Sequence, residues 1–106
     1  MPKGYVIIQE SIHDEEAMEA YSKTSGAPLI EHGAKLLCLD DHFEVLEGEW
    51  RGNRVSVIEF ESVEMARRWY HSPSNVESTR LRRAAADFNM VVAAAFVPKD
   101  PNSKLI

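Results

Sequence analysis

The sequence has few of the residues that build disulfides, metal clusters, membrane spans or nucleic-acid surfaces. Among 106 residues there is one cysteine, Cys38, so an internal disulfide and a thiolate metal cluster are both excluded. The longest apolar run, residues 90–97, is too short to span a bilayer. Basic residues number 12 against 17 acidic ones, and the net charge of -5 disfavours binding to nucleic acid or anionic lipid. We therefore expect a soluble, cytoplasmic protein that binds neither nucleic acid nor membranes.

Sequence signatures of common catalytic and cofactor sites are also lacking. There is no glycine-rich phosphate loop, and no local signature of a Ser/His/Asp or Cys/His nucleophile. The four histidines never occur with HxH or HxxxH spacing, which a metal site on one strand or helix would show. We predict no metal and no cofactor, and the sequence leaves open whether the protein is an enzyme.

What the chain does contain is a regular succession of strand and helix patterns in a single domain, residues 1–98, followed by a tail, residues 99–106. Apolar periodicity and capping residues first predict a strand over 5–12 and a helix capped by Asp14, which is kinked or restarted at Pro28. A second strand begins at residue 34, bends at 40–42, resumes over 43–50 and is joined by a turn at Gly52 and Asn53 to a third strand over 54–61. A helix capped by Ser62, a helix over 75–86 with a capping box at Ser74 and Glu77, and a last strand over 88–97 complete the order. This order, βαββαβ with an extra helix before the last strand, is that of a ferredoxin-like α+β fold with an antiparallel four-stranded sheet.

The last predicted strand is apolar on both of its faces. Met90 and Val92 lie on one face, and Val91 and Ala93 lie on the other. Helices can cover only one face of such a sheet, and a second copy related by a two-fold axis is the simplest cover for the other. We therefore predict a homodimer with facing sheets, and Trp50 near the hairpin tip is our candidate for a dimer contact.

Two glutamates, Glu47 and Glu59, interrupt the predicted apolar strands. If Gly52 and Asn53 form a two-residue turn, the two carboxylates lie on opposite faces; a three-residue loop or a bulge at Gly52 would bring them onto one face as a pair. Such a pair could hold a proton and act as an acid or as a hydrogen-bond donor to a ligand. The simpler interpretation is that each carboxylate pairs with an arginine or marks an exposed strand end.

Other candidate residues lie at the ends of the predicted helices. His32 and His71 could titrate near neutral pH and act as a base, although histidines at helix C-termini more often bind helix carbonyls. Five arginines are concentrated within residues 67–83. They could bind an anionic ligand, face the acidic residues between 10 and 19, or lie on solvated helix faces.

Several segments together resemble the small bacterial proteins grouped as domain of unknown function 1330, within the dimeric α/β-barrel superfamily. The first segment is the helix over residues 21–33, whose end belongs to the run HGAKLL. The others are VLEGEW, VIEFESVEMARRWYHSPS and an arginine in the next helix, which is Arg82. The resemblance implies a ferredoxin-like subunit, a homodimer with facing sheets and a cleft near the sheet, but no established activity. The chain departs from the family pattern at Ala34, in place of a second glycine, near Cys38, where an arginine is usual, and near Asn75, where an aromatic residue is usual. If the missing arginine and aromatic residue hold a ligand in the family, this protein has altered or lost that site.

These observations lead to one main expectation and two alternatives. We expect a small carboxylate-bearing or aromatic molecule to bind in a cleft between the sheet and the helices, with Glu59, Glu47, His32 and Arg82 in contact with it. The first alternative is a cofactor-free isomerase or oxygenase-like enzyme with Glu59 or a histidine as base, because the superfamily includes such enzymes acting on small aromatic or lactone substrates. The second alternative is an interaction module without a ligand site.

Overall fold

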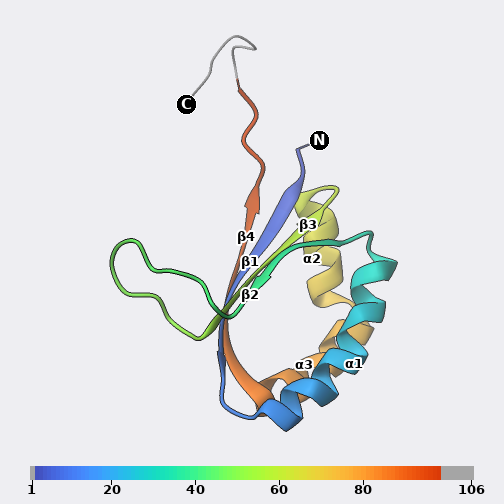
Figure 1. Ribbon diagram of the computed structural model, residues 1–106. Coiled ribbons are helices and arrows are strands. Elements are labelled where there is room, and N and C mark those ends of the chain that lie inside the picture. Colours follow the sequence, from blue (N-terminus) through green and yellow to red (C-terminus); the bar gives the residue numbers. More distant parts are fainter. Residues whose placement is uncertain (1, 99–106) are drawn as a thin grey trace.

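The protein folds as a four-stranded antiparallel sheet with three helices on one of its faces (Figure 1). The computed structural model describes residues 2–98. In chain order the elements are β1 (Gly4–Ile12), α1 (Glu15–Glu31), β2 (Lys35–Asp40), β3 (Arg54–Phe60), α2 (Val63–His71), α3 (Pro73–Ala85) and β4 (Ala86–Ala94). The strands are arranged in the order β2-β3-β1-β4, so β2 and β4 are the two edges. The predicted α+β class, the antiparallel sheet and the extra helix before the last strand are confirmed, whereas the predicted tail, residues 99–106, lies outside the described residues.

Side-chain oxygens cap the helices at their N-termini, as the sequence predicts for two of the three. The Asp14 carboxylate accepts the Ala17 N–H at 3.0 Å, and the Ser62 hydroxyl accepts the Met65 N–H at 3.1 Å. The helix does not restart at Pro28, which lies inside a continuous α1. The predicted cap of α3 is wrong, because Ser72 caps this helix in place of Ser74 and Pro73 takes the first helical position, where no N–H partner is needed.

The hydrophobic core lies between the sheet and the helices. Val6, Ile8, Ile58 and Phe60 project from β1 and β3 toward α2, where Trp69 packs on them. The ring centroids of Phe60 and Trp69 are 5.5 Å apart. Because Val6 pairs with Ile58 on one side and with Val92 on the other, one face of all three strands carries this core.

The predicted continuation of the second strand over residues 43–50 is wrong. Strand β2 ends at Asp40, which pairs with Val55 of β3, and residues 41–53 form a long irregular loop, which we call the arm. Gly48 has a left-handed φ of 76°, a conformation that an extended strand does not contain. The arm stands out from the sheet on the side away from the helices (Figure 1), and its rings of Phe43 and Trp50 pack on each other with centroids 5.9 Å apart.

The end of the arm is fixed to strand β1 by Gly52 and Asn53. The Asn53 N–H donates to the Glu10 carbonyl at 2.8 Å, and the Asn53 side chain accepts from the Ile12 N–H at 3.0 Å and donates to the Ile12 carbonyl at 3.2 Å. Gly52 has a φ of 100° and passes so close to the Glu10 carbonyl that a Cβ atom would overlap it. The direction in which the arm leaves the sheet is therefore set by local contacts.

The face of the sheet opposite the helices carries apolar side chains, and no layer formed by residues 2–98 covers it (Figure 1). Tyr5 and Ile7 of β1 pair with Glu59 and Val57 of β3, and on the other side Ile7 pairs with Val91 of β4. Alternation along the strands places these side chains on the face away from the core, which we call the open face. Val91 is 58% exposed there, in keeping with the two apolar faces expected for the last strand.

The two glycines of the arm region provide a test of this geometry. Gly48→Ala should lower the free energy of unfolding by about 1 kcal/mol, because Gly48 has a positive φ but nothing lies within 4 Å of the position that the added methyl group would take. Gly52→Ala should lower the free energy of unfolding by about 3 kcal/mol, because the added methyl group would overlap the Glu10 backbone and the positive φ of this residue would also be strained. Urea denaturation of the two variants measures the difference, and equal losses would show that Gly52 does not pack against β1.

Candidate functional site

A cavity of about 390 Å³ lies between α2 and the strands β1 and β4. Its apolar wall is formed by residues from all three elements, namely Val6, Ala66, Trp69, Met90, Val91 and Val92. Because β4 is an edge strand and Val91 belongs to the open face, the cavity reaches the border between the helix layer and the open face. Its size suits a small aromatic molecule.

Trp69 supplies an unusual polar atom to the surroundings of this cavity. The side chain is 3% exposed, and among the described residues its indole Nε1–H has no hydrogen-bond acceptor. A buried N–H without a partner costs about 1–3 kcal/mol. Because the nitrogen itself is buried, it is not exposed in the cavity. The helical periodicity of α2 predicts Trp69 as a core residue, and that is also where it lies.

The rim of the cavity is polar and comes from the same helix. Arg67, Tyr70 and His71 line it, and the rings of Tyr70 and His71 meet edge to face with centroids 5.2 Å apart. Tyr70 and His71 also line a second hollow, formed with Val76, Thr79, Arg80 and Arg83 of α3. A ligand in the cavity would therefore have a cation and an imidazole near its exposed end.

Glu59, the first of the predicted ligand residues, lies on the open face and does not line this cavity. Its carboxylate accepts from Lys3 Nζ at 3.2 Å and from the Tyr5 hydroxyl at 3.3 Å. The hydrogen bond and the charge of Glu59, with a further contribution from Glu61, raise the pKa of the Lys3 ammonium group. The partner of Glu59 is thus a lysine, where the simpler interpretation expected an arginine, and its role in ligand binding stays a prediction.

Glu47 and His32 lie in two other parts of the molecule. Glu47 is exposed on the arm, outside any strand, so the pair of Glu47 and Glu59 predicted for one register does not form. His32 follows the last residue of α1, and its ring Nδ1 lies 2.8 Å from the Pro28 carbonyl. That contact is the helix-end role that the sequence allowed as its simpler interpretation.

Arg82 is buried beneath α3, where the sequence predicted an exposed or rim position. It is 6% exposed, and its guanidinium carbon lies 4.9 Å from the centroid of the Phe88 ring. The Tyr21 ring meets Phe88 edge to face at 6.2 Å. The side chain is buried because α3 packs on both α1 and β4 at this point. The four predicted ligand residues are therefore distributed over the open face, the arm, the end of α1 and the interior under α3.

A buried carboxylate, Glu10, was not predicted as a site residue from the sequence. It is 2% exposed and receives hydrogen bonds from Arg54 Nε at 2.7 Å and from the Ser56 hydroxyl. The signal was present, because Glu10 follows Val6 and Ile8 at intervals of two, which places it on the buried face. Of the alternatives that the sequence left open for the arginines of residues 67–83, a contact with Glu10 is not formed, because the partner of Glu10 is Arg54 on the adjacent strand.

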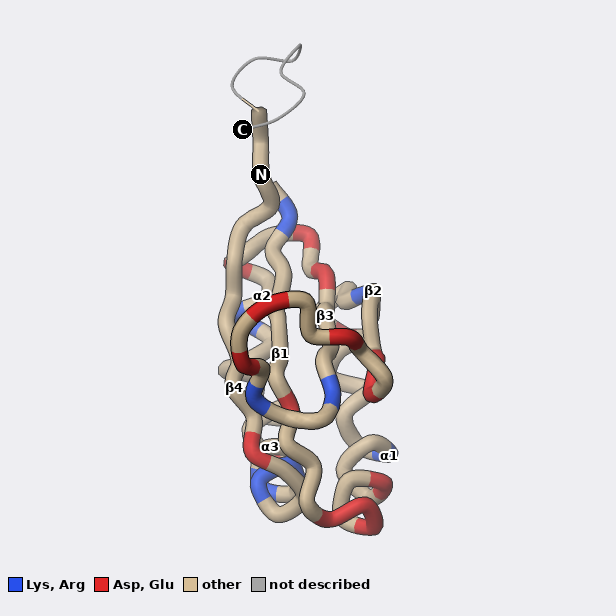
Figure 2. Tube along the Cα trace, turned by 60° about the vertical axis from the view of Figure 1, so that its left-hand side comes forward, with Lys and Arg blue, Asp and Glu red and all other residues tan. Residues whose placement is uncertain are grey.

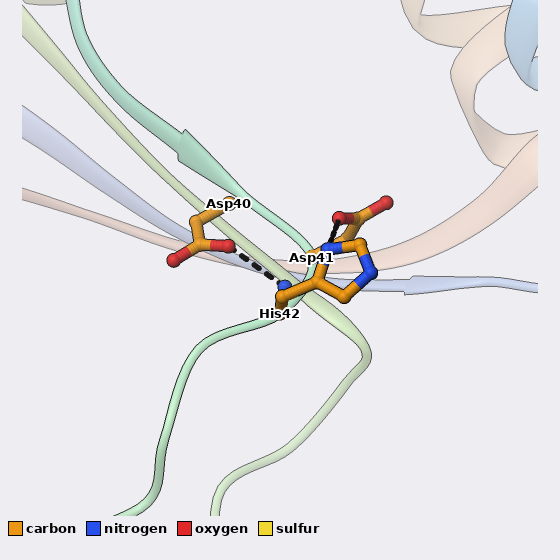
Figure 3. A group of neighbouring side chains, drawn as sticks. All are labelled: Asp40, Asp41 and His42. Carbon is orange, nitrogen blue, oxygen red and sulfur yellow. Dashed lines mark hydrogen bonds and ion pairs between the residues drawn. The ribbon is translucent and has the colours of Figure 1, made fainter.

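Asp40, Asp41 and His42 form a group at the start of the arm whose ligand atoms all lie within 4.8 Å of one another (Figure 3). The three residues are exposed. Their polar atoms are engaged with one another, since the Asp40 carboxylate accepts the His42 N–H at 2.7 Å and an Asp41 oxygen lies 2.5 Å from His42 Nδ1. Exposed acidic groups of this kind are common without an ion, and we assign no metal to them.

Comparison with known proteins identifies a family and a fold. The family model of DUF1330, a domain of unknown function, matches residues 3–96. No curated protein matches the sequence. No helix within residues 2–98 has the length and apolar character needed to cross a membrane.

Solved structures similar to this one include proteins of unknown function and an oxygenase. The RPA0582 protein of unknown function from Rhodopseudomonas palustris is 19% identical, with a TM-score of 0.72 over 92% of this chain and 85% of that chain. SnoaB, a cofactor-independent oxygenase from Streptomyces nogalater, is 12% identical, with a TM-score of 0.63 over 93% and 98%. A dimeric ferredoxin-like protein of unknown function from Thermobifida fusca is 11% identical, with a TM-score of 0.56 over 89% and 92%. At these identities the likeness shows the ferredoxin-like fold.

The burial of Tyr21 predicts a loss of stability at high pH. Burial of its hydroxyl raises the pKa of Tyr21 above 10.0, although the charge of Arg82 acts in the opposite direction. The unfolded chain therefore releases this proton at a lower pH than the folded chain. The contribution of Tyr21 to the free energy of unfolding is complete below about pH 10. Above that pH it decreases by at most about 1.4 kcal/mol per pH unit. Denaturation curves between pH 9 and 11 should show a smaller decline for Tyr21→Phe than for the wild type, whereas Tyr70→Phe, which alters an exposed ring, should keep the wild-type decline.

Proposed function

This chain belongs to the DUF1330 family, and we propose that it is a homodimeric, cytoplasmic protein that binds a small aromatic carboxylate or carbonyl compound in the cavity between α2 and β4. One observation carries the proposal: an apolar cavity of about 390 Å³ between α2 and β4 whose rim carries Arg67 and His71. Apolar walls with a few well-placed polar groups are typical of small-molecule sites.

The chemistry of the rim and wall indicates what the ligand should carry. Arg67 can only donate hydrogen bonds, and it is cationic. It therefore selects a ligand with an acceptor, preferably an anionic one. The rings of Trp69 and Tyr70, with centroids 6.2 Å apart, offer flat apolar surfaces for an aromatic body.

The homodimer in this proposal is supported by the open face and by the neighbours. Tyr5, Ile7, Val57 and Val91 form an apolar strip across β1, β3 and β4 on the open face. An apolar strip of this kind is typical of a protein interface. The Thermobifida fusca neighbour is described as dimeric, and a two-fold arrangement of facing sheets would cover the open face of both chains.

A ligand screen with a matched pair of arginine variants tests the binding site. Aromatic carboxylates should raise the melting temperature of the wild type more than their neutral amides do, because Arg67 lies on the rim. Arg67→Gln should weaken carboxylate binding roughly fivefold, as expected for about 1 kcal/mol from an exposed charge. Arg68→Gln is the control, since Arg68 is the neighbouring residue, is exposed and pairs with Glu64 away from the cavity.

A further variant, Glu59→Gln, tests the predicted contact of Glu59, which would require the ligand to reach the open face. The proposal fails if no compound stabilises the wild type, or if Arg67→Gln and Arg68→Gln bind carboxylates equally well.

A second candidate function is a cofactor-free enzyme with His71 as its base. The observation that favours it is the position of His71 on the rim of the cavity, because a neutral imidazole there could take a proton from a bound ligand. The oxygenase SnoaB shares the fold, and its activity is a reason to test this chain but is not carried over to it.

The enzyme candidate is tested with the compounds that bind. Each is incubated with the wild type in air, and the product mass and oxygen consumption are followed. His71→Gln should lower turnover at least about a hundredfold, the usual contribution of a general base. His32→Gln should leave turnover unchanged, because His32 binds the end of α1 away from the cavity. A bound compound that the wild type leaves chemically unchanged would argue for binding without catalysis.

A further inference from the structure

The arm is an apolar and acidic segment that its own chain leaves uncovered within the described residues. Leu46 is 85% exposed, Val45 46% and Trp50 40%. The arm also carries Asp41, Glu44, Glu47 and Glu49 against one cation, Arg51 (Figure 2). Several large apolar side chains on a projecting loop indicate a surface that another molecule covers.

A complementary surface exists on the same chain, on α2 and α3. The cavity lined by Arg67 and the hollow lined by Arg80 and Arg83 lie next to each other, because both are lined by Tyr70 and His71, and we call the two together the α2–α3 groove. Arg80 is held by Glu77 at 2.8 Å, whereas no ion pair found within residues 2–98 involves Arg67 or Arg83. The groove is thus apolar within and cationic at its rim, the opposite charge to that of the arm.

The arm cannot reach this groove within one chain, because it projects from the sheet on the side away from the helices (Figure 1). It can do so between two chains. When two sheets face each other about a two-fold axis that runs along their strands, the β2 edge of one lies against the β4 edge of the other. The arm leaves from β2 and β3, and the groove begins at β4.

We propose that the arm of each subunit, residues 41–53, docks on the α2–α3 groove of the other subunit and covers the opening of its cavity. This inference rests on the homodimer of the proposed function. The occupant is a second copy of this chain because the surface of matching charge is on the chain itself. An acidic arm is repelled by anionic lipid, which argues against a membrane as the covering surface. The fixed base of the arm at Gly52 and Asn53 lowers the entropy cost of docking.

Cross-linking between two differently tagged chains tests the contact. Both chains carry Cys38→Ala, because Cys38 lies on β2 and would react itself. One chain then carries Leu46→Cys on the arm and the other Arg83→Cys at the groove. After co-expression, a short bis-maleimide should link the two tags at least five times more efficiently than when the second chain carries Lys23→Cys, an exposed residue of α1 that is absent from the groove.

A second measurement avoids new cysteines. Leu46→Ala with Trp50→Ala should raise the dimer dissociation constant at least tenfold, measured by sedimentation in dilute solution, because large apolar side chains carry most interface energy. Equal cross-linking of Arg83→Cys and Lys23→Cys in a protein of dimeric mass would overturn the arm contact and leave the proposed homodimer standing. A monomeric mass at all concentrations would overturn both, while the ligand screen with Arg67→Gln would still judge the binding site separately.

Discussion

The buried carboxylate of Glu10 is the constraint on which the arrangement of strands and arm depends. An isolated charge at 2% exposure would be prohibitively costly, and Arg54 and Ser56 make it tolerable by donating hydrogen bonds from the adjacent strand. A one-residue shift between β1 and β3 would turn both donors to the other face, so the buried charge opposes such a shift. The backbone of the same residue accepts the Asn53 N–H, and the fixed register therefore also fixes the base of the arm.

The two faces of the sheet differ in what they carry. The helix face contains the core and the buried ion pair, and beside α2 the edge strand β4 leaves a cavity in it. On the open face, Lys3, Tyr5 and Glu59 form a polar network next to the apolar strip. In the proposed homodimer, such a polar group would specify how the two open faces align more than it would add to their affinity.

The sequence predicted the elements well because their signals are local. Asp14 and Ser62 identify helix starts through a single hydrogen bond each, and period-two alternation in β1 and β3 identifies the core face. The arm was missed because its apolar residues, Phe43, Val45, Leu46 and Trp50, resemble a continuation of the strand before it. The positive φ of Gly48 and the lack of a pairing strand within the described chain reveal the difference. The candidate site depended on contacts between distant residues: Arg82 could be recognised as notable but not as buried, and Glu59 as unusual but not as a partner of Lys3.

Three features of the fold that contribute little to its stability lie beside the cavity. Within residues 2–98, strand β4 has no neighbour on its outer side, α2 is a short helix of nine residues, and the Trp69 N–H has no acceptor. The first two leave an apolar cavity whose rim carries Arg67. The Trp69 nitrogen is buried and is not exposed in that cavity, so it lowers the stability of the fold without offering a contact to a ligand. The apolar cavity with its cationic rim is therefore the structural argument for the proposal that this protein binds a small molecule.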